Sequence, residues 1–300
     1  MLGVCGAAIL LAGAGIWRSV RMDREFRDPR LLLSRFPPED SLVFSADVAR
    51  LRRGGLLGPS KAAPEPEYKA FLDGTGFDYR RDLDSLTAAF SRSGTYFVLR
   101  GRFDWKQLQT YAERNGGSCY QQLCRMQGST PERRISWLPL RPDAMALAVS
   151  TSDLAATRLT KTGDAVTSPL PGSPVWISVP GSELQRQSAM APNLKFMLSA
   201  LGSADRVVIT FDAAGSDVKV AGIEARLDAT CRTDDAAKVL ASQLRIATSD
   251  LKEAQARQHA AQDDQILAVL TKGSFDQTGR KVTGSWPLAK TVLDSLLAGI

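Results

Sequence analysis

The order in which strand-like and helix-like segments follow one another constrains the fold of this chain most. An apolar strand pattern after Pro37 and Pro38 precedes two apolar β-type runs, at 86–90 and 94–103, and then an amphipathic helix pattern at 104–117. From residue 174 the order returns as a strand, a two-strand hairpin, a long helix and two more strands. The pattern predicts an α+β protein with two similar units, each an antiparallel sheet with helices on one face.

Turn and cap residues support individual elements of this scheme. The Ser-Arg-Ser-Gly stretch at 91–94 predicts a hairpin turn, and Asp104 is the expected N-cap of the helix that ends near Gly116. Residues 151–161 are expected to form a helix with a Ser or Thr cap, and a closing helix is expected at 287–300, with Pro287 near its start.

Four segments follow from this scheme. Residues 1–17 are expected to be a transmembrane anchor or a signal, and residues 18–36 a polar juxtamembrane helix. Residues 37–165 form the first α+β unit and residues 170–300 the second.

The first seventeen residues carry no charged side chain. As a helix they span about 26 Å, close to the apolar thickness of a bilayer, and Trp17 and Arg18 then fall at the interface. An uncleaved anchor is the prediction. A cleaved signal is the alternative, because residues 12–14 have a small-x-small pattern, although no positive side chain precedes the apolar stretch.

The orientation of this segment is open to two interpretations. Five arginines between Arg18 and Arg30 place the body in the cytoplasm if the positive-inside rule is applied literally, although acidic residues are interleaved with them. A single amino-terminal span before a large domain is typical of a signal anchor that exports the domain. The expected location is therefore the cell membrane, single-pass, with an extracytoplasmic body.

Composition narrows the class of partner. The chain is 44% hydrophobic and 23% charged, which is typical of a globular protein. Its net charge of +6 comes from Lys and Arg scattered among acids, whereas nucleic-acid binders cluster them on one face. We expect no nucleic-acid partner.

The cysteines offer one candidate disulfide. Cys5, Cys119, Cys124 and Cys231 include no Cys-x-x-Cys pair of the kind found in zinc and redox sites. In a straight strand Cys119 and Cys124 would lie about 16 Å apart, so they can be joined only if residues 120–123 form a turn. The pair is a candidate disulfide if the domain is exported, and it stays reduced if the domain is not.

No catalytic constellation stands out. The one histidine, His259, lies in a polar stretch and is expected at the surface. Ser60 and Lys61 are adjacent in a proline-rich loop, and there is no Gly-x-Ser-x-Gly motif. No phosphate-binding or dinucleotide-binding glycine motif is complete. We therefore expect neither catalytic residues nor a cofactor.

Three carboxylates form the weak candidate for a metal site. Asp82 and Asp84 would lie on one side of a strand near Asp78, where they could share a divalent cation. The alternative is that Arg80 and Arg81 balance them at the entry to a strand.

Three sequence blocks carry a family resemblance: "FPPEDSLVFSADV", "GTGFDYRRDLDSL" and "GRFDWKQLQTYAERNGG". In these blocks and in the arrangement of most of its body, the chain resembles uncharacterised membrane-anchored or lipoprotein-like bacterial α+β proteins. The resemblance implies no activity and no site residues.

The expected function is a non-enzymatic, membrane-tethered extracytoplasmic binding or scaffold protein. Its partner would be a protein, a lipid or a small ligand, met in a cleft or on a sheet surface, with the membrane held through the amino-terminal helix. Two alternatives stay open: an accessory subunit of a membrane complex, and a tethered hydrolase with an unrecognised site, built for example from the Asp78–Asp84 block.

Overall fold

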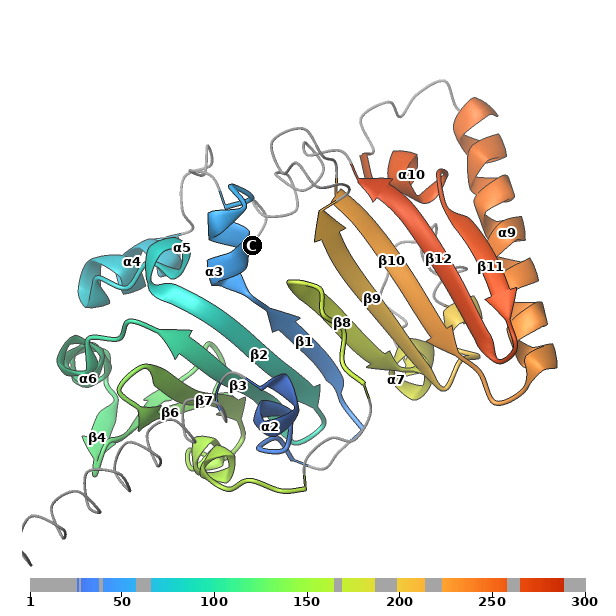
Figure 1. The fold of residues 1–300 in the computed structure, drawn as a ribbon. Helices are drawn as coiled ribbons and strands as arrows, with labels where there is room; N and C mark the ends of the chain where they lie inside the picture. The colour runs from blue at the N-terminus through green and yellow to red at the C-terminus, as the bar shows by residue number, and fades with distance from the viewer. Residues whose placement is uncertain are drawn as a thin grey trace, which may run out of the picture.

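The computed structural model describes residues 26, 28–37, 40–57, 66–164, 169–186, 199–213, 223–257 and 265–288. In this part of the chain, helices pack on one antiparallel sheet of twelve strands (Figure 1). The predicted α+β class is confirmed. The sequence predicted one sheet per unit, whereas the structure has a single large sheet.

The strands, in chain order, are β1 (Leu42–Ala46), β2 (Leu83–Ser91), β3 (Gly94–Gly101), β4 (Ser118–Tyr120), β5 (Leu123–Gln127), β6 (Arg134–Arg141), β7 (Ala144–Ser150), β8 (Val175–Pro180), β9 (Arg206–Ala213), β10 (Ile223–Thr230), β11 (Ser274–Thr278) and β12 (Lys281–Leu288). In space they lie in the order β11-β12-β10-β9-β8-β1-β2-β3-β7-β6-β5-β4.

The helices are α2 (Pro29–Leu33), α3 (Val48–Arg53), α4 (Pro66–Thr75), α5 (Tyr79–Asp82), α6 (Trp105–Arg114), the 3₁₀ helix η1 (Ala155–Thr160), α7 (Gly181–Arg186), α9 (Asp234–Arg257) and α10 (Gln265–Leu270). Helices α6 and α9 lie at opposite ends of the sheet, against β4–β5 and β11–β12 respectively (Figure 1).

The strand order repeats on either side of the central β1–β8 pair. We term β1–β7 with their helices the first half, and β8–β12 with theirs the second half. In each half the opening strand is followed by helical residues, a hairpin and a longer helix, and the last strand returns to pair with the second strand of the hairpin. Val43 to Ala46 of β1 pair with Ser178 to Val175 of β8, and this pairing joins the halves.

One face of the sheet, which we term the helix face, is apolar through both halves. A single row of cross-strand partners crosses it: Leu227, Ile209, Ile177, Phe44, Ala88, Phe97, Leu147, Trp137 and Cys124. On this face Leu240 and Leu244 of α9 pack in the second half, and Leu108 and Ala112 of α6 in the first. Burial of these apolar side chains holds the helices on the sheet.

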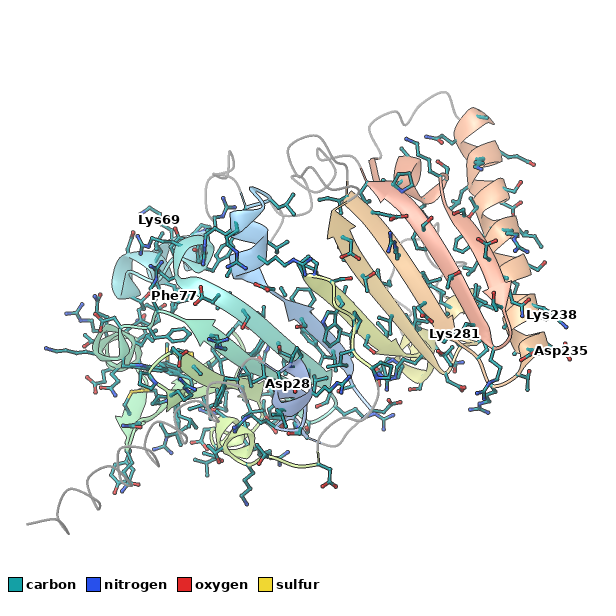
Figure 2. The ribbon with its side chains drawn as sticks, in the orientation of Figure 1. Asp28, Lys69, Phe77, Asp235, Lys238 and Lys281 are labelled. Atoms are coloured by element: carbon teal, nitrogen blue, oxygen red, sulfur yellow. A yellow bond between two sulfur atoms is a disulfide. The ribbon has the colours of Figure 1, made fainter. Side chains whose placement is uncertain are left out.

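The other side, which we term the opposite face, changes character along its length. Its central row runs Asp228, Val208, Ser178, Val43, Ala89, Tyr96, Ala148 and Ser136. In the first half, α2 and η1 cover this face, and Leu32 and Leu159 pack with Tyr96 and Ala148. In the second half the same face is polar, with Lys281 of β12 standing beside Asp228 (Figure 2).

Several elements form where turn and cap residues in the sequence predicted them. β2 and β3 form the predicted hairpin, with Arg92 and Ser93 at its turn. Asp104 caps α6 by accepting a hydrogen bond from the backbone N–H of Gln107 at 3.0 Å. The chain leaves that helix through Gly116, whose positive φ of 76° suits glycine.

Two predictions of local structure are wrong in detail. Residues 155–160 are a 3₁₀ helix, which fits closely over the small alanines of β7. Pro287 lies in β12 and does not begin a helix. It pairs with Glu224 of β10. Because β11 begins opposite Ser285, Pro287 has a strand partner on one side only, a position that proline tolerates in a sheet.

Some predicted segments fall outside the description. No helix of the described residues is long and apolar enough to cross a membrane, and the predicted anchor, 1–17, lies outside them. Of the predicted juxtamembrane helix, 18–36, the described part contains α2. His259, Ser60 and Lys61 also lie outside the described residues, as does most of the predicted closing helix, 289–300.

Candidate functional site

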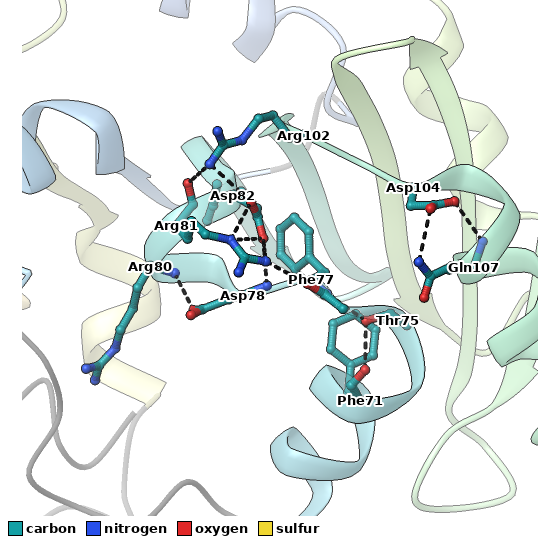
Figure 3. Close-up of polar contacts among 12 residues, drawn as sticks. Phe71, Thr75, Phe77, Asp78, Arg80, Arg81, Asp82, Arg102, Asp104 and Gln107 are labelled. Atoms are coloured by element: carbon teal, nitrogen blue, oxygen red, sulfur yellow. Dashed lines mark hydrogen bonds and ion pairs between the residues drawn. The ribbon is translucent and has the colours of Figure 1, made fainter.

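The Asp78–Asp84 block forms a short helical bend between α4 and β2. Asp78 is the N-cap of α5, and its carboxylate accepts hydrogen bonds from the backbone N–H of Arg80 at 3.0 Å and the hydroxyl of Tyr68 at 3.3 Å (Figure 3). Burial, with the charge of Asp78, raises the pKa of Tyr68 to about 12. The first carboxylate of the block therefore has a structural role.

Asp82 is the most enclosed carboxylate of the block. Its oxygens lie 2.7 Å from Nη2 of Arg81 and 3.1 Å from Nη2 of Arg102, and they also accept the backbone N–H of Asp78 at 3.0 Å. The hydrogen bonds from Arg81 are the largest cause that lowers the pKa of Asp82, and burial opposes them. Figure 3 shows both guanidinium groups directed at this carboxylate.

Asp84 faces away from the other two acids, toward α3. It accepts a hydrogen bond from Nη2 of Arg52 at 2.9 Å, and Nη1 of Arg52 donates to the carbonyls of Arg80 and Leu83 at 2.9 and 3.0 Å. Within the described residues no three His, Cys, Asp or Glu side chains come close enough to hold a metal ion. The block is a set of arginine and backbone contacts, in which Arg81 and Arg102 bind Asp82 and Arg52 binds Asp84.

A cavity of about 670 Å³ opens beside Asp82. Aromatic rings form part of its wall: the stacked rings of Phe77 and Phe103 lie 5.3 Å apart, and the tilted rings of Phe103 and Trp105 lie 5.2 Å apart. The charged groups that face it are largely engaged with one another, since Arg81 and Arg102 both bind Asp82. This cavity therefore offers few unsatisfied polar groups to a ligand.

A larger cavity of about 750 Å³, which we term the central cavity, lies over the opposite face where the two halves meet. Its floor includes Ser45 of β1, Thr87 of β2 and Trp176 of β8, which are neighbours across three strands. Its walls come from α2, α3 and the segment 170–174 that leads into β8. The central cavity thus draws residues from both halves.

The position of the central cavity follows from the change in the opposite face. On one side stands α2, part of the cover over the first half. On the other begins the polar face of the second half, hollowed by a cavity of about 710 Å³ that shares the segment 170–173 with it. The central cavity lies where the cover ends, with Ser45 partly exposed on its floor and Thr87 and Trp176 buried.

Both carboxylates and arginines line the central cavity. Three carboxylates line it, and each has a partner: Asp28 accepts the backbone N–H of Arg30 at 2.9 Å, Asp47 accepts that of Arg50 at 2.8 Å, and Asp84 binds Arg52. Asp28 marks the α2 wall in Figure 2. Four arginines also line the cavity: Arg30, Arg50, Arg53 and Arg100.

The sequence did not indicate this site. Its arginines come from two short helices and one strand that are far apart in the chain, and the pairing of β2 with β1 and β3 brings them together. One weak signal existed, namely the arginines Arg50 and Arg53 three residues apart, directly after a strand. Three residues apart on a helix lie on one face.

The structure joins Cys119 and Cys124 in a disulfide. The two cysteines face each other in the β4–β5 hairpin, and Gln121 and Gln122 form its turn with positive φ angles of 46° and 70°. The condition set by the sequence, a turn over 120–123, is therefore met. Cys231 is a buried free thiol, and burial raises its pKa.

Comparison with known proteins gives a likeness of fold. No protein-family model and no curated protein sequence matches the chain. Crystal form III of TP0453 is similar with a TM-score of 0.50 and 11% identity, over 90% of this chain and 98% of that one. Crystal form IV of TP0453 has a TM-score of 0.47 and 11% identity, over 89% and 96%. At this identity the likeness to form III concerns the fold alone.

Proposed function

We propose that this chain is a membrane-tethered, extracytoplasmic and non-enzymatic binding protein that takes a small ligand in the central cavity. The observation that carries the proposal is the cavity of about 750 Å³ at the junction of the halves, with floor residues from β1, β2 and β8. Its volume falls in the range of small-molecule sites, and such sites are common where two structural units meet.

The repeated strand order supports a body of two related units, as the sequence pattern proposed. In such a body β1 and β8 are equivalent opening strands, and their edges pair with each other. A ligand over this pair would contact both units, and its binding would depend on how they are joined. The unit boundaries, 37–165 and 170–300, remain part of the proposal.

The proposed tether lies close to the cavity in sequence. Phe26 and Asp28, at the entry to α2, line the cavity and lie within the predicted polar juxtamembrane segment, 18–36, that follows the predicted anchor. A membrane-held stem would therefore lead directly into the cavity wall. The disulfide supports an extracytoplasmic body, because such bonds persist in oxidising compartments.

Ligand retention tests the binding role. The full-length protein is purified from its own membranes in mild detergent and examined by native mass spectrometry. We expect a small molecule bound to the wild type and lost from Ala49→Trp, which fills the cavity from α3. Ala70→Trp is the matched control, an exposed alanine of α4 outside the cavity.

Two outcomes would contradict the binding role. One is a wild type that carries no small molecule, and the other is a ligand that Ala49→Trp retains as well as Ala70→Trp does. A membrane protein that copurifies in equal amount, with the cavity empty, would favour the accessory-subunit alternative.

A thiol-labelling experiment tests the location. In intact cells a membrane-impermeant maleimide should label Cys119 and Cys124 only after reduction, because the disulfide protects them. Cys231 is buried and should need denaturation. Labelling of the pair that requires lysis but no reductant would place the body in the cytoplasm.

A further inference from the structure

We infer that the ligand of the central cavity is a small organic anion, bound through a carboxylate or phosphate group by the guanidinium groups of Arg53, Arg30 and Arg100. The inference rests on the proposed function, and it adds the chemical class of the ligand. Guanidinium groups bind carboxylate and phosphate through paired N–H donors, and this geometry is the reason to expect an oxyanion.

The arginines of α3 separate into two with structural partners and one without. Arg50 donates to the carbonyl of Gly172 at 2.9 Å, and Arg52 binds Asp84. Arg53 is exposed and lines the cavity, and its guanidinium group has no hydrogen bond or ion pair within the described residues. Five N–H donors of one side chain are therefore available at the cavity wall.

Arg30, on α2, lines the same cavity as Arg53. Its backbone N–H is bound by Asp28, but its guanidinium group has no partner among the residues that the structure describes. The two short helices α2 and α3, which both line the cavity, thus each supply one unengaged guanidinium group. Exposed like charges repel, and a bound anion would relieve that repulsion.

Arg100 supplies a more enclosed cation from β3. Its side chain is 19% exposed, and its contacts are long: 3.4 Å from Nη2 to Asp143 and 3.5 Å from Nη1 to the carbonyl of Phe26. Asp143 is shared with Arg141, whose Nε lies 3.1 Å away. Nε of Arg100 is buried and has no acceptor in the described part of the chain. Buried donors with weak partners favour an added acceptor.

The carboxylates around the cavity do not make it a cation site. Asp28 and Asp47 are fixed by backbone N–H groups at the starts of α2 and α3, and Asp84 is neutralised by Arg52. They do limit the net positive charge, so we expect the fork geometry of arginine, rather than charge alone, to select the ligand.

The floor residues and the volume of the central cavity indicate what the ligand carries besides its acidic group. Ser45 and Thr87 place hydroxyl groups there, 3.5 Å apart, and Trp176 adds an apolar ring. A volume of about 750 Å³ is far larger than one inorganic ion needs. The ligand is therefore expected to carry an organic body beside its acidic group.

Calorimetric titration of the full-length protein in detergent tests the inference. Three probes are used: succinate for a carboxylate, glycerol 3-phosphate for a phosphate ester, and glycerol as the neutral control. We expect saturable binding of one acid and none of glycerol. Arg53→Gln should weaken that binding by about tenfold or more, the loss of one charge-assisted contact.

Matched variants separate the site from general charge effects. Arg92→Gln removes the same charge from the exposed β2–β3 turn, and it should change the affinity less than about twofold. Arg53→Lys keeps the charge and loses the fork, and it should fall between the wild type and Arg53→Gln. Because Arg53 is exposed, its variants should fold as the wild type does, which thermal unfolding checks.

Equal weakening by Arg53→Gln and Arg92→Gln would overturn the inference, and so would no binding of either acid. The two proposals fail differently. If mass spectrometry finds a neutral molecule that Ala49→Trp loses, and neither acid binds, the anion inference fails and the binding role stands. If no bound molecule is found and neither acid binds, both fail.

Discussion

The two halves of the sheet share a strand order but differ in how many of their faces are buried. β7 of the first half has the near-continuous apolar sequence Ala-Met-Ala-Leu-Ala-Val, and its residues pack on both faces. β10 of the second half alternates apolar and polar residues, and every second residue is buried. Continuous apolar strands are typical of sheets covered on both sides, and alternating strands of sheets covered on one.

This difference shows how one topology can create a site. If both halves followed the pattern of β7, the cover on the opposite face would extend across the sheet. If both followed β10, α2 and η1 would have no apolar surface to cover. The central cavity exists because the pattern changes near the β1–β8 pair. The following predictions test this comparison, from the largest expected effect to the smallest.

The largest effect is expected when a charge is added to the buried part of the opposite face, in the first half, and compared with removal of a charge from the exposed part of the same row, in the second half. Ala148→Asp places a carboxylate among the buried residues under η1, and it should lower the free energy of unfolding by at least about 3 kcal/mol. Asp228→Ala, in the same row of the second half, loses only an exposed 3.4 Å ion pair with Lys281 and should cost about 0.5 kcal/mol or less. Chemical denaturation measures both, and similar costs would break the comparison.

The disulfide should stabilise the first half only. Replacement of Cys119 and Cys124 by alanine removes a short covalent loop, and it should cost about 2 kcal/mol. Cys231→Ala, the control in the second half, removes one buried sulfur and should cost about 1 kcal/mol. Hydrogen exchange should show the first loss concentrated in β4–β6. A loss spread evenly over both halves would contradict this.

A smaller effect should depend on pH. The folded state lowers the pKa of Asp82, so the ionised carboxylate contributes stability that is present above about pH 4 and is lost as the pH falls through the folded pKa. Asp82→Asn should therefore destabilise by on the order of 1 kcal/mol at pH 7 and by less at pH 3. Asp276→Asn is the control, an exposed acid of β11. A pH-independent cost would show that the Arg81–Asp82 pair contributes nothing.

The smallest effect on stability should appear at alkaline pH. The pKa of Tyr68, raised to about 12, disfavours its ionisation in the folded state, so stability should decline from about pH 10 upward as the unfolded chain ionises first. Tyr68→Phe should flatten this decline and remove an absorbance step at 295 nm with a midpoint near 12. An unchanged step would show that another tyrosine is responsible.

Local structure could be predicted from the sequence because short-range chemistry sets it. The β2–β3 hairpin, the Asp104 cap and the turn between Cys119 and Cys124 depend on residues within a few positions of one another. The wrong predictions arose where packing overrode the local pattern. The strand position of Pro287 is permitted because β11 begins opposite Ser285, and η1 packs on the alanines of β7, a contact between segments that local sequence does not show.

The central cavity could not be predicted because it depends on long-range register. Ser45, Thr87 and Trp176 become neighbours only through the pairing of β1 with β2 and β8. The acidic block was visible in sequence as Asp78, Asp82 and Asp84, but the direction of each carboxylate was not. The periodicity of a strand predicts which face of the sheet a residue lies on, but it does not predict which residue of the adjacent strand lies beside it.

The most direct test of a ligand site at the junction of the two halves is a crystal structure of the protein purified from its own membranes. The account predicts density for a small molecule in the central cavity, in contact with Arg53 and with the floor at Ser45 or Trp176. A central cavity filled only by water, with a ligand on the polar face of β9–β12, would contradict it.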